Sequence, residues 1–253
     1  MKFTFLGTGT SQGVPVITCN CAVCTSTDVR DNRMRTSLLV QSEKTTLVID
    51  TGPDFRSQML REKVQDLDAV VYTHGHKDHV AGLDDIRPFN YMKNKTIEVY
   101  AEVRVQEVLK REFAYAFQQH HYPGAPQIHL NTISETTFTI GDISLIPIRL
   151  MHNELPVLGF RINDFTYITD ANFISEQELE KIKGSKILVL NALRREKHFS
   201  HFNLDEAIEI ANKINPDRAY FTHISHHLGK YKDLEQELPD NMHLAYDGLA
   251  LEL

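Results

Sequence analysis

No stretch of this chain is apolar over eighteen consecutive residues, so the sequence predicts no membrane-spanning helix. The first residues, 1–7, are interrupted by glycine too early to resemble a signal peptide, and we therefore expect a cytoplasmic protein. An excess of positive charge is also missing: the formal net charge is −7, which disfavours non-specific binding to a nucleic-acid backbone. With 253 residues, 42% of them hydrophobic, the chain is predicted to form one globular domain, 1–253.

Cysteine is scarce, and its few occurrences are clustered. The chain has three cysteines, Cys19, Cys21 and Cys24, all within six residues. An odd and closely spaced group in a protein expected to be cytoplasmic indicates metal ligation rather than disulfide bonding. The alternative is a set of three reduced thiols buried in the protein.

Strand and helix patterns alternate along the chain. Apolar runs bounded by turn residues predict strands at 2–6, 36–41, 46–50, 69–73, 137–140, 143–150, 158–162, 166–169, 187–191, 218–222 and near 243–246. Helical spacing predicts helices at 53–63, 103–117, 175–183 and 203–214, the last capped by Asn203 or Ser200. Residues 112–131 fit an irregular loop that overhangs a site. Two β-rich halves, each followed by helices, predict two packed sheets with helices outside.

The most informative motif is the HxHxDH sequence at 74–79, which directly follows the expected strand 69–73. It places three imidazoles and one carboxylate within six residues. Because a turning loop directs alternate side chains to different points, His74 and His76 can face one point while Asp78 and His79 face another. Imidazole suits Zn, Mn and Fe, and a carboxylate shifts the preference toward harder divalent ions. The motif therefore predicts a site for two metal ions.

Three further residues with metal-ligand chemistry follow other expected strands. His152, Asp170 and His223 each lie just beyond the carboxyl end of a strand. Taken alone, each has an ordinary alternative, as a hydrogen-bonded loop histidine or as a helix-capping aspartate. Their recurrence at the same kind of position predicts that they join the cluster at 74–79.

Together these segments resemble the metallo-β-lactamase superfamily over nearly the whole chain. The resemblance is carried by Phe-Leu-Gly-Thr-Gly at 5–9, Leu-Val-Ile-Asp-Thr-Gly at 47–52, Thr-His-Gly-His-Lys-Asp-His at 73–79 and the later His/Asp/His set. It implies an α+β fold, an αββα four-layer sandwich of two mixed β-sheets flanked by helices. It also implies two ligand sets, with Asp170 bridging them: His74, His76 and His152 for one metal ion, and Asp78, His79 and His223 for the other.

The resemblance gives Asp50 a role beside this site. It implies that Asp50, at the end of the strand 46–50, accepts a hydrogen bond from a ligand histidine and orients it. The alternative is an aspartate that forms the turn before Gly52.

The cysteine cluster makes the chain resemble the PhnP-like branch, which comprises phosphoribosyl cyclic phosphodiesterases. This resemblance implies a structural zinc bound by Cys19, Cys21, Cys24 and His226, with His227 as the alternative fourth ligand. It also implies that His201, just before the helix 203–214, is the general acid. His198 is the second candidate, and a hydrogen-bonded loop histidine is the alternative for both.

The expected function is that of a binuclear metal-dependent phosphodiesterase acting on a small cyclic phosphodiester. The substrate would be of the phosphoribosyl 1,2-cyclic phosphate or 2′,3′-cyclic nucleotide type, with two divalent ions, Mn or Zn, activating water and Asp78 and His201 as catalytic residues. Ribonuclease Z-like RNA processing is the main alternative, but it calls for a basic glycine-rich arm that this acidic chain lacks.

Thiolester or lactone hydrolysis also occurs on this fold and is a further alternative. Another is a protein that binds metal without turnover, but such a protein would need neither a bridging aspartate nor an acid. We expect no stable nucleic-acid binding and no membrane partner, and the resemblance suggests a homodimer.

Overall fold

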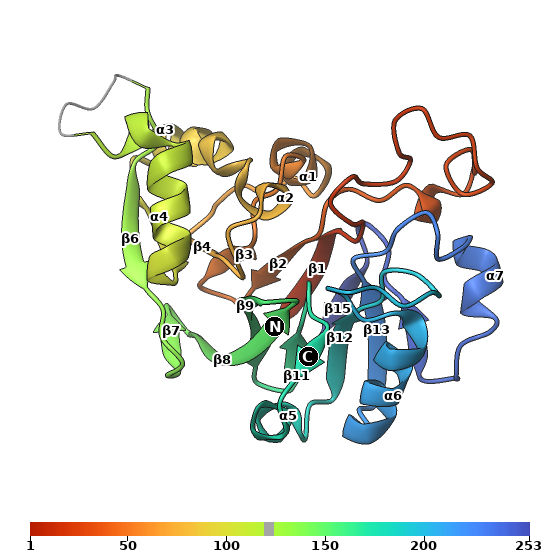
Figure 1. Ribbon diagram of the computed structural model, residues 1–253. Helices are drawn as coiled ribbons and strands as arrows, with labels where there is room; N and C mark the ends of the chain where they lie inside the picture. The colour runs from red at the N-terminus through yellow and green to blue at the C-terminus, as the bar shows by residue number, and fades with distance from the viewer. Residues whose placement is uncertain (119–123) are drawn as a thin grey trace.

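The computed structural model describes residues 1–118 and 124–253, in which two β-sheets lie face to face with helices on their outer sides (Figure 1). Helices α1 to α4 cover one sheet, and α5 and α6 lie on the opposite side of the molecule (Figure 1). The fold is the αββα sandwich of two mixed sheets that the resemblance implied, with parallel and antiparallel pairs in both sheets.

The first sheet has, among the described residues, the strand order β15-β1-β2-β3-β4-β5-β6. Its strands are β1 (Lys2–Gly7), β2 (Ser37–Gln41), β3 (Thr46–Ile49), β4 (Ala69–Val71), β5 (Ile97–Ala101), β6 (Ile128–Thr132) and β15 (Ala250–Glu252). The helices of this half are α1 (Phe55–Arg61), α2 (Lys77–Val80), α3 (Arg87–Lys93) and α4 (Val103–Glu112). Strands β3 to β6 run parallel to one another.

The second sheet has the order β11-β8-β9-β10-β12-β13-β14 in the described chain, with β7 paired to β8. Its strands are β7 (Phe138–Ile140), β8 (Ile143–His152), β9 (Leu155–Ile162), β10 (Phe165–Tyr167), β11 (Phe173–Ile174), β12 (Ile187–Asn191), β13 (Arg218–Thr222) and β14 (Met242–Leu244). Its helices are α5 (Glu176–Ile182), α6 (Leu204–Ile214) and α7 (Tyr231–Glu235).

Three apolar clusters correspond to the three interfaces of a four-layer sandwich. The central cluster joins side chains of both sheets, with Phe3 of β1 stacked on Phe165 of β10 at a ring-centroid distance of 3.8 Å. The other two clusters lie between each sheet and its own helices. A fully buried phenylalanine contributes about 1.5–3 kcal/mol relative to exposure, so this layering supports a rigid base for the loops at the strand ends.

Helix α6 illustrates how the sequence fixes a loop near the site. Its apolar residues Leu204, Ala207, Ala211 and Ile214 form one buried face. Asn203 caps the amino end: its side chain accepts from the backbone N–H of Glu206, and the Glu206 side chain accepts from the backbone N–H of Asn203. The start of the helix is therefore fixed, and so is the direction of the loop that precedes it.

Some sequence-based expectations about elements were incomplete. Strands 187–191 and 218–222 and the helices at 175–183 and 203–214 are present to within one residue at either end. The irregular loop expected at 112–131 is wrong in part, since Ile128–Thr132 forms β6 beside β5. Residues 119–123 of that stretch lie outside the described residues. Within the described residues, no helix is long and apolar enough to span a bilayer.

Candidate active site

Loops from the carboxyl ends of several strands converge at one edge of the sandwich. The HxHxDH segment follows β4 and turns into α2, Asp50 follows β3, and His152 ends β8. Asp170 follows β10, and His223 follows β13. Asp50, Asp170 and His223 have positive φ angles of 65°, 52° and 55°, a left-handed backbone that costs about 1–3 kcal/mol for a residue other than glycine. Each strand therefore turns sharply where its polar side chain enters the site.

Asp170 lies at the centre of the cluster. Its Oδ1 atom is 3.0 Å from Nε2 of His223, and its Oδ2 atom is 3.3 Å from Nε2 of His79 and 3.7 Å from Nε2 of His74. Three groups of potential ligand atoms, each within 4.8 Å of one another, share this aspartate: His74/His76/Asp170, Asp78/His79/Asp170/His223 and His152/Asp170/His201. All three groups have the Asp170 carboxylate in common, and His152 shares it with His201 rather than with His74 and His76, although its ring centroid lies 5.2 Å from that of His76.

Hydrogen bonds on the outer side of three imidazoles determine which nitrogen faces the cluster. His79 Nδ1 donates to Asp50 Oδ2 at 2.7 Å, and His152 Nδ1 donates to the backbone oxygen of Ser200 at 2.7 Å. Thr73 Oγ1 donates to Asp50, so it accepts from His74 Nδ1 at 2.9 Å. Each Nδ1 thus carries the proton, and in the neutral ring the Nε2 lone pair is directed into the site. Asp50 makes the contact with a histidine that the sequence predicted.

Buried ring nitrogens without hydrogen-bond partners are concentrated here. The Nε2 atoms of His74, His79 and His223 are buried and have no hydrogen-bond partner among the described residues. Buried polar groups in folded proteins are almost always satisfied, and an unpaired buried lone pair of this kind is typical of a metal-ligand position. A cation between these nitrogens and the Asp170 carboxylate would satisfy all of them, so the residues present fit a divalent metal ion.

The site is electrostatically polarised. Burial opposes ionisation of Asp170, but His223 and His79 outweigh it, and the pKa of Asp170 lies well below its usual value. Burial also opposes the charged form of His79, yet Asp170, Asp78 and Asp50 hold the pKa of His79 well above the usual value. Burial lowers the pKa of His74. Asp170 therefore stays ionised and attracts positive charge, whether as protons or as metal ions.

His201 reaches the cluster from the loop before α6. Its Nε2 atom lies 3.6 Å from Asp170 Oδ2, and its ring centroid lies 4.5 Å from that of His152. His198 is further out: its Nδ1 contacts Nδ1 of His201 at 3.2 Å, and Ser200 Oγ lies within 3.2 Å of both rings. Burial lowers the pKa of His201. Of the two candidates, His201 is the one that faces the carboxylates.

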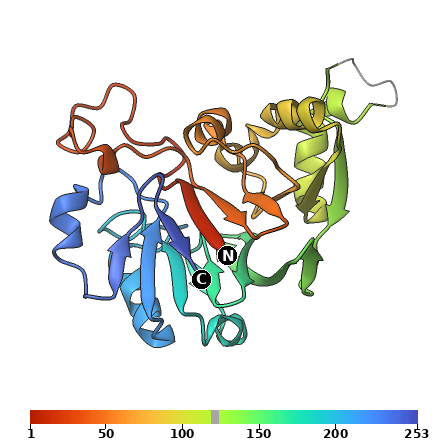
Figure 2. The same cartoon turned by 180° about the vertical axis from the view of Figure 1, so that it is seen from behind.

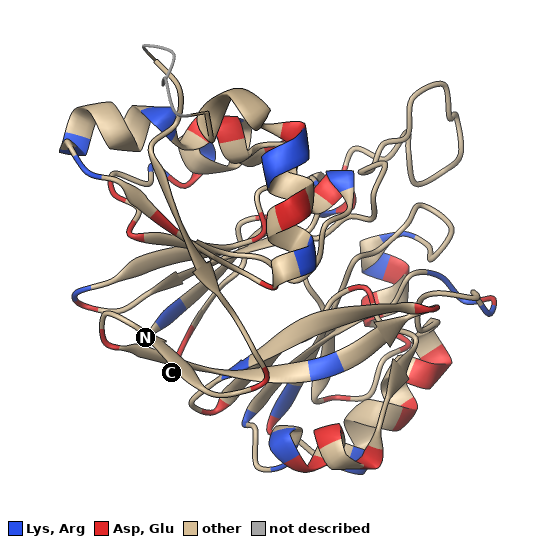
Figure 3. Ribbon diagram, turned by 60° about the vertical axis from the view of Figure 1, so that its left-hand side comes forward, with Lys and Arg blue, Asp and Glu red and all other residues tan. Residues whose placement is uncertain are grey.

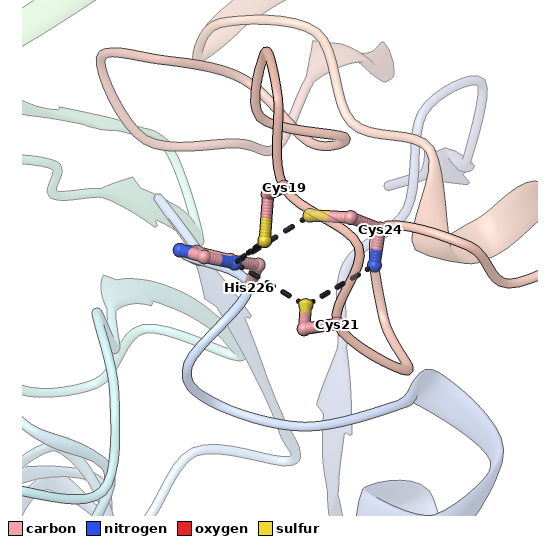
Figure 4. Close-up of side chains that lie close together, drawn as sticks. All are labelled: Cys19, Cys21, Cys24 and His226. Atoms are coloured by element: carbon pink, nitrogen blue, oxygen red, sulfur yellow. Dashed lines mark hydrogen bonds between the residues drawn. The ribbon is translucent and has the colours of Figure 1, made fainter.

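The cysteine cluster is a second, separate group of potential ligands. The Sγ atoms of Cys19, Cys21 and Cys24 lie 3.3, 3.4 and 3.5 Å from Nδ1 of His226, and all four side chains point toward one another (Figure 4). Ligand atoms about 2.0–2.3 Å from a tetrahedral zinc ion lie roughly 3.5 Å apart. The four-residue set therefore has the spacing of a closed zinc site. His226, rather than the alternative His227, supplies the nitrogen.

Backbone contacts join the residues between β1 and the cysteine loop to the segment after β13. The N–H of Thr10 donates to the oxygen of Ile224, and the N–H of Ile224 donates to the oxygen of Thr8. Viewed from behind, the loop that follows β1 lies beside α7 and the segments near the carboxyl end of β13 (Figure 2). His223 of the first cluster and His226 of the second lie three residues apart in the same segment, so the two clusters share one support.

Sequence reasoning missed two groups that shape the site. Thr73 connects Asp50 with His74, and the backbone oxygen of Ser200 orients His152. Thr73 directly precedes His74, the first histidine of the motif, and this position in the sequence could have identified it. The Ser200 carbonyl has no side-chain signature, so no sequence pattern could have pointed to it.

The family model described as the beta-lactamase superfamily domain matches residues 45–224. A solved structure described as a new diphosphatase from the PhnP family is 39% identical, with a TM-score of 0.94, and the match covers 100% of this chain and 97% of that one. Zn(2+)-bound PqqB from Methylobacterium extorquens is 20% identical, with a TM-score of 0.79 and full coverage of both chains, a likeness of fold alone.

Among curated proteins, an octanoyltransferase from Porphyromonas gingivalis is 38% identical over 252 residues. The match takes in 98% of this chain but 51% of that protein. The chain thus spans about half the length of this relative.

Proposed function

The chain belongs to the beta-lactamase superfamily, in its PhnP-like branch, and is a metal-dependent hydrolase, and on this premise we propose that it hydrolyses small cyclic phosphodiesters. The substrate would be of the phosphoribosyl 1,2-cyclic phosphate or 2′,3′-cyclic nucleotide type. The single observation that carries the proposal is the position of Asp170 among the imidazoles of His74, His79 and His223, whose buried Nε2 atoms have no hydrogen-bond partner in the described part of the chain.

Residue roles follow from the two ligand sets around Asp170. We assign His74, His76 and His152 to one divalent ion, and Asp78, His79 and His223 to the other, with Asp170 between them. His152 is included because its ring centroid lies 5.8 Å from that of His74 and 5.2 Å from that of His76. The support is the Nδ1 hydrogen bonding of His74, His79 and His152, which directs their Nε2 lone pairs inward. Imidazole and carboxylate accept both Mn and Zn, so either metal fits the proposal.

Bound divalent ions would acidify water and stabilise negative charge on the phosphoryl oxygens. The protein itself has to supply the proton for the leaving alkoxide. We assign this step to His201, whose Nε2 faces the cluster from the loop before α6. The ring acts in its doubly protonated form, which Asp170 favours and burial opposes. As water adds to phosphorus and loses a proton to solvent, the P–O bond to the alkoxide breaks and the Nε2 proton of His201 passes to the departing oxygen; the neutral ring then regains a proton from solvent. A positioned acid of this kind contributes about 10²–10⁴-fold.

The cysteine cluster has a structural role in this proposal. Cys19, Cys21, Cys24 and His226 would supply all four ligands of a tetrahedral zinc ion. Because no coordination position remains for water or substrate, such a zinc ion is structural rather than catalytic. We propose that this zinc fixes the loop at 13–30, which has few secondary-structure elements, to the segment that carries His223.

The alternatives fit less well. Ribonuclease Z-like processing requires a surface for tRNA, and the net charge of −7 works against one. The octanoyltransferase name does not carry over, since about half of that relative lies outside the match. That residues 1–253 form a single domain, act in the cytoplasm and pair as a homodimer stay predictions.

Hydrolysis of bis(p-nitrophenyl) phosphate by protein reconstituted with Mn or Zn tests the proposal. We expect turnover in the wild type and its loss in Asp78→Ala. The matched control is Asp240→Ala, which removes an exposed carboxylate before β14, at the amino end of that strand. Absence of turnover on this diester and on 2′,3′-cyclic nucleotides, in protein shown to hold both metal ions, would refute the proposed function.

A further inference from the structure

A cavity of about 630 Å³ lies between the loop that joins β1 to β2, helix α1 and the segment before β15. Among the described residues, none of the histidines and aspartates proposed as metal ligands lines it, and neither does any of the three cysteines. The cavity is therefore separate from both clusters, and a ligand bound there does not compete for the metal ions.

Charge is distributed unevenly along the loop between β1 and β2. Residues 8–27 include no Lys, Arg, Asp or Glu, and most of this loop is tan in Figure 3. The charged residues of the loop are concentrated at 28–35, beside the cavity. Four arginines line the cavity: Arg30, Arg33, Arg35 and Arg61. Three of them form ion pairs with carboxylates: Arg30 with Asp28, Arg35 with Asp54, and Arg61 with Asp247 and Glu62.

Arg33 differs from the other three arginines. It is 4% exposed and forms no ion pair with the described residues. Its Nη1 atom donates to Thr8 Oγ1 at 2.8 Å and to the backbone oxygen of Ala245 at 2.6 Å, while Nε and Nη2 have no acceptor in the described part of the chain. Burial lowers the pKa of Arg33, and the charges of Asp247 and Asp31 offset this only in part. Because a buried charge is costly unless it is paired, such a guanidinium at the wall of a cavity is typical of an anion-binding position.

The free edge of Arg33 and its surroundings indicate the kind of anion. Nε and Nη2 lie on one edge of the planar guanidinium, which matches the two oxygens of a carboxylate. Since the other arginines are paired, a single positive charge is left, and Asp54 and Asp247 would repel a second negative charge. Much of the remaining lining is apolar: Val14, Pro15, Val29, Met34 and Tyr246. Val29 is 79% exposed, so an apolar ligand would gain by covering it.

Arg33 also connects the cavity with the support of both clusters. Its backbone N–H donates to the oxygen of Val14 at 2.7 Å, and the N–H of Val14 donates to the oxygen of Arg33 at 2.8 Å, at the base of the cysteine loop. Thr8, which accepts from Nη1 of Arg33, also accepts through its backbone oxygen from the N–H of Ile224, next to His223. A ligand that neutralises Arg33 would therefore stabilise the base of the cysteine loop.

We propose that this cavity is a second ligand site, which binds a small monocarboxylate with an apolar body. The carboxylate accepts hydrogen bonds from Nε and Nη2 of Arg33, and the body of the ligand lies on Val14, Val29 and Tyr246. The site goes beyond the proposed hydrolysis and is independent of it, because binding uses none of the proposed metal ligands.

A series of straight-chain carboxylates, titrated into the Mn-loaded protein and followed by calorimetry, tests the proposal. We expect one octanoate to bind per chain with a Kd below about 1 mM. The affinity should rise from butyrate through hexanoate to octanoate, by up to about fourfold for each added methylene group. Octanamide has the same body without the charge and should bind about tenfold more weakly. Octanoate should leave the KM for bis(p-nitrophenyl) phosphate unchanged.

Two variants locate the bound carboxylate. Arg33→Lys keeps the charge but loses the two-donor edge, and Val29→Asp adds a negative charge at an exposed position without a change to the core. Each should weaken octanoate binding about tenfold. Arg30→Lys is the matched control, since Arg30 lines the same cavity but is already paired with Asp28, and its Kd should stay within about twofold of the wild type. No octanoate binding by the wild type, equal affinity for octanamide, or octanoate binding that Val29→Asp leaves unchanged would overturn the proposal.

Discussion

The His/Asp cluster and the cysteine cluster lie close together in the chain's fold but are supported in different ways. Residues of the first, such as Asp170 and His223, follow buried strands whose packing positions them. The cysteines of the second lie on a loop with one short helical turn at Val29–Asp31 and are only partly buried. From this comparison we expect a metal ion at the His/Asp cluster to serve chemistry on a scaffold that is already rigid, and a metal ion at the cysteine cluster to serve folding.

The largest effect that separates the two clusters is expected from Asp170→Ala. Removal of the carboxylate common to both ligand sets should lower kcat on bis(p-nitrophenyl) phosphate by at least about 10⁴-fold, since both divalent ions lose a ligand. The far-UV circular dichroism should remain that of the wild type, because β10 and its neighbours do not depend on this side chain. Measurable turnover within about tenfold of the wild type would contradict the central position given to Asp170.

The second effect concerns His201 and depends on the leaving group. His201→Gln should lower kcat on a 2′,3′-cyclic nucleotide by about 10³-fold, with little change in KM, because an alkoxide needs a proton as it leaves. On bis(p-nitrophenyl) phosphate the loss should be far smaller, since p-nitrophenolate leaves without one. His198→Gln, a change on the same loop, is the control. Equal losses on both substrates would show that His201 positions other groups rather than acting as the acid.

The structure also shows why some of the site could be predicted from sequence and some could not. The histidines and aspartates that we propose as ligands follow apolar strand runs, and both the strand period and the turn are local features. The irregular loop expected at 112–131 was partly wrong because β6 has a weak alternation, with Ile128 and Leu130 only half-buried at the sheet edge. Its pairing with β5 is a tertiary contact, which overrides local propensity.

Spacing alone could not settle contacts between distant segments. That His226 rather than His227 meets the thiols depends on how the segment after β13 turns. Similarly, a cavity of about 300 Å³ beside the motif loop is lined by His74, Arg104 and Leu155, which lie far apart in the sequence, and it becomes visible only when α4 is placed on that loop.

A third and smaller effect on activity is expected from Cys21→Ser. The variant should bind about one zinc ion fewer per chain, as measured by atomic emission, and should keep kcat within about tenfold of the wild type. Hydrogen exchange should show loss of protection for amides in 13–30, while β4, β10 and β13 stay protected. Lys44→Ala, at an exposed turn of the first sheet, is the control. Retained zinc with retained protection would exclude Cys21 as a ligand.

The smallest effect distinguishes two thiols of the same cluster in metal-free protein. The backbone N–H of Cys24 donates to Sγ of Cys21 at 3.4 Å and, with His226, lowers the pKa of Cys21 to about 6. Burial raises the pKa of Cys24 to about 11. Iodoacetamide reacts with thiolates, so alkylation of Cys21 should be near its maximum at pH 7 and fall as the pH drops below 6.

Alkylation of Cys24 should still be accelerating at pH 9, because most of that thiol remains protonated there. Peptide mass spectrometry with fragmentation separates the two sites, and added Zn should protect both of them. If both thiols titrate together near the ordinary pKa of 9, the loop does not hold its ligand geometry without metal. That result would sharpen the contrast with the His/Asp cluster, since the cysteine loop would then depend on the ion for its local structure as well as for its anchoring.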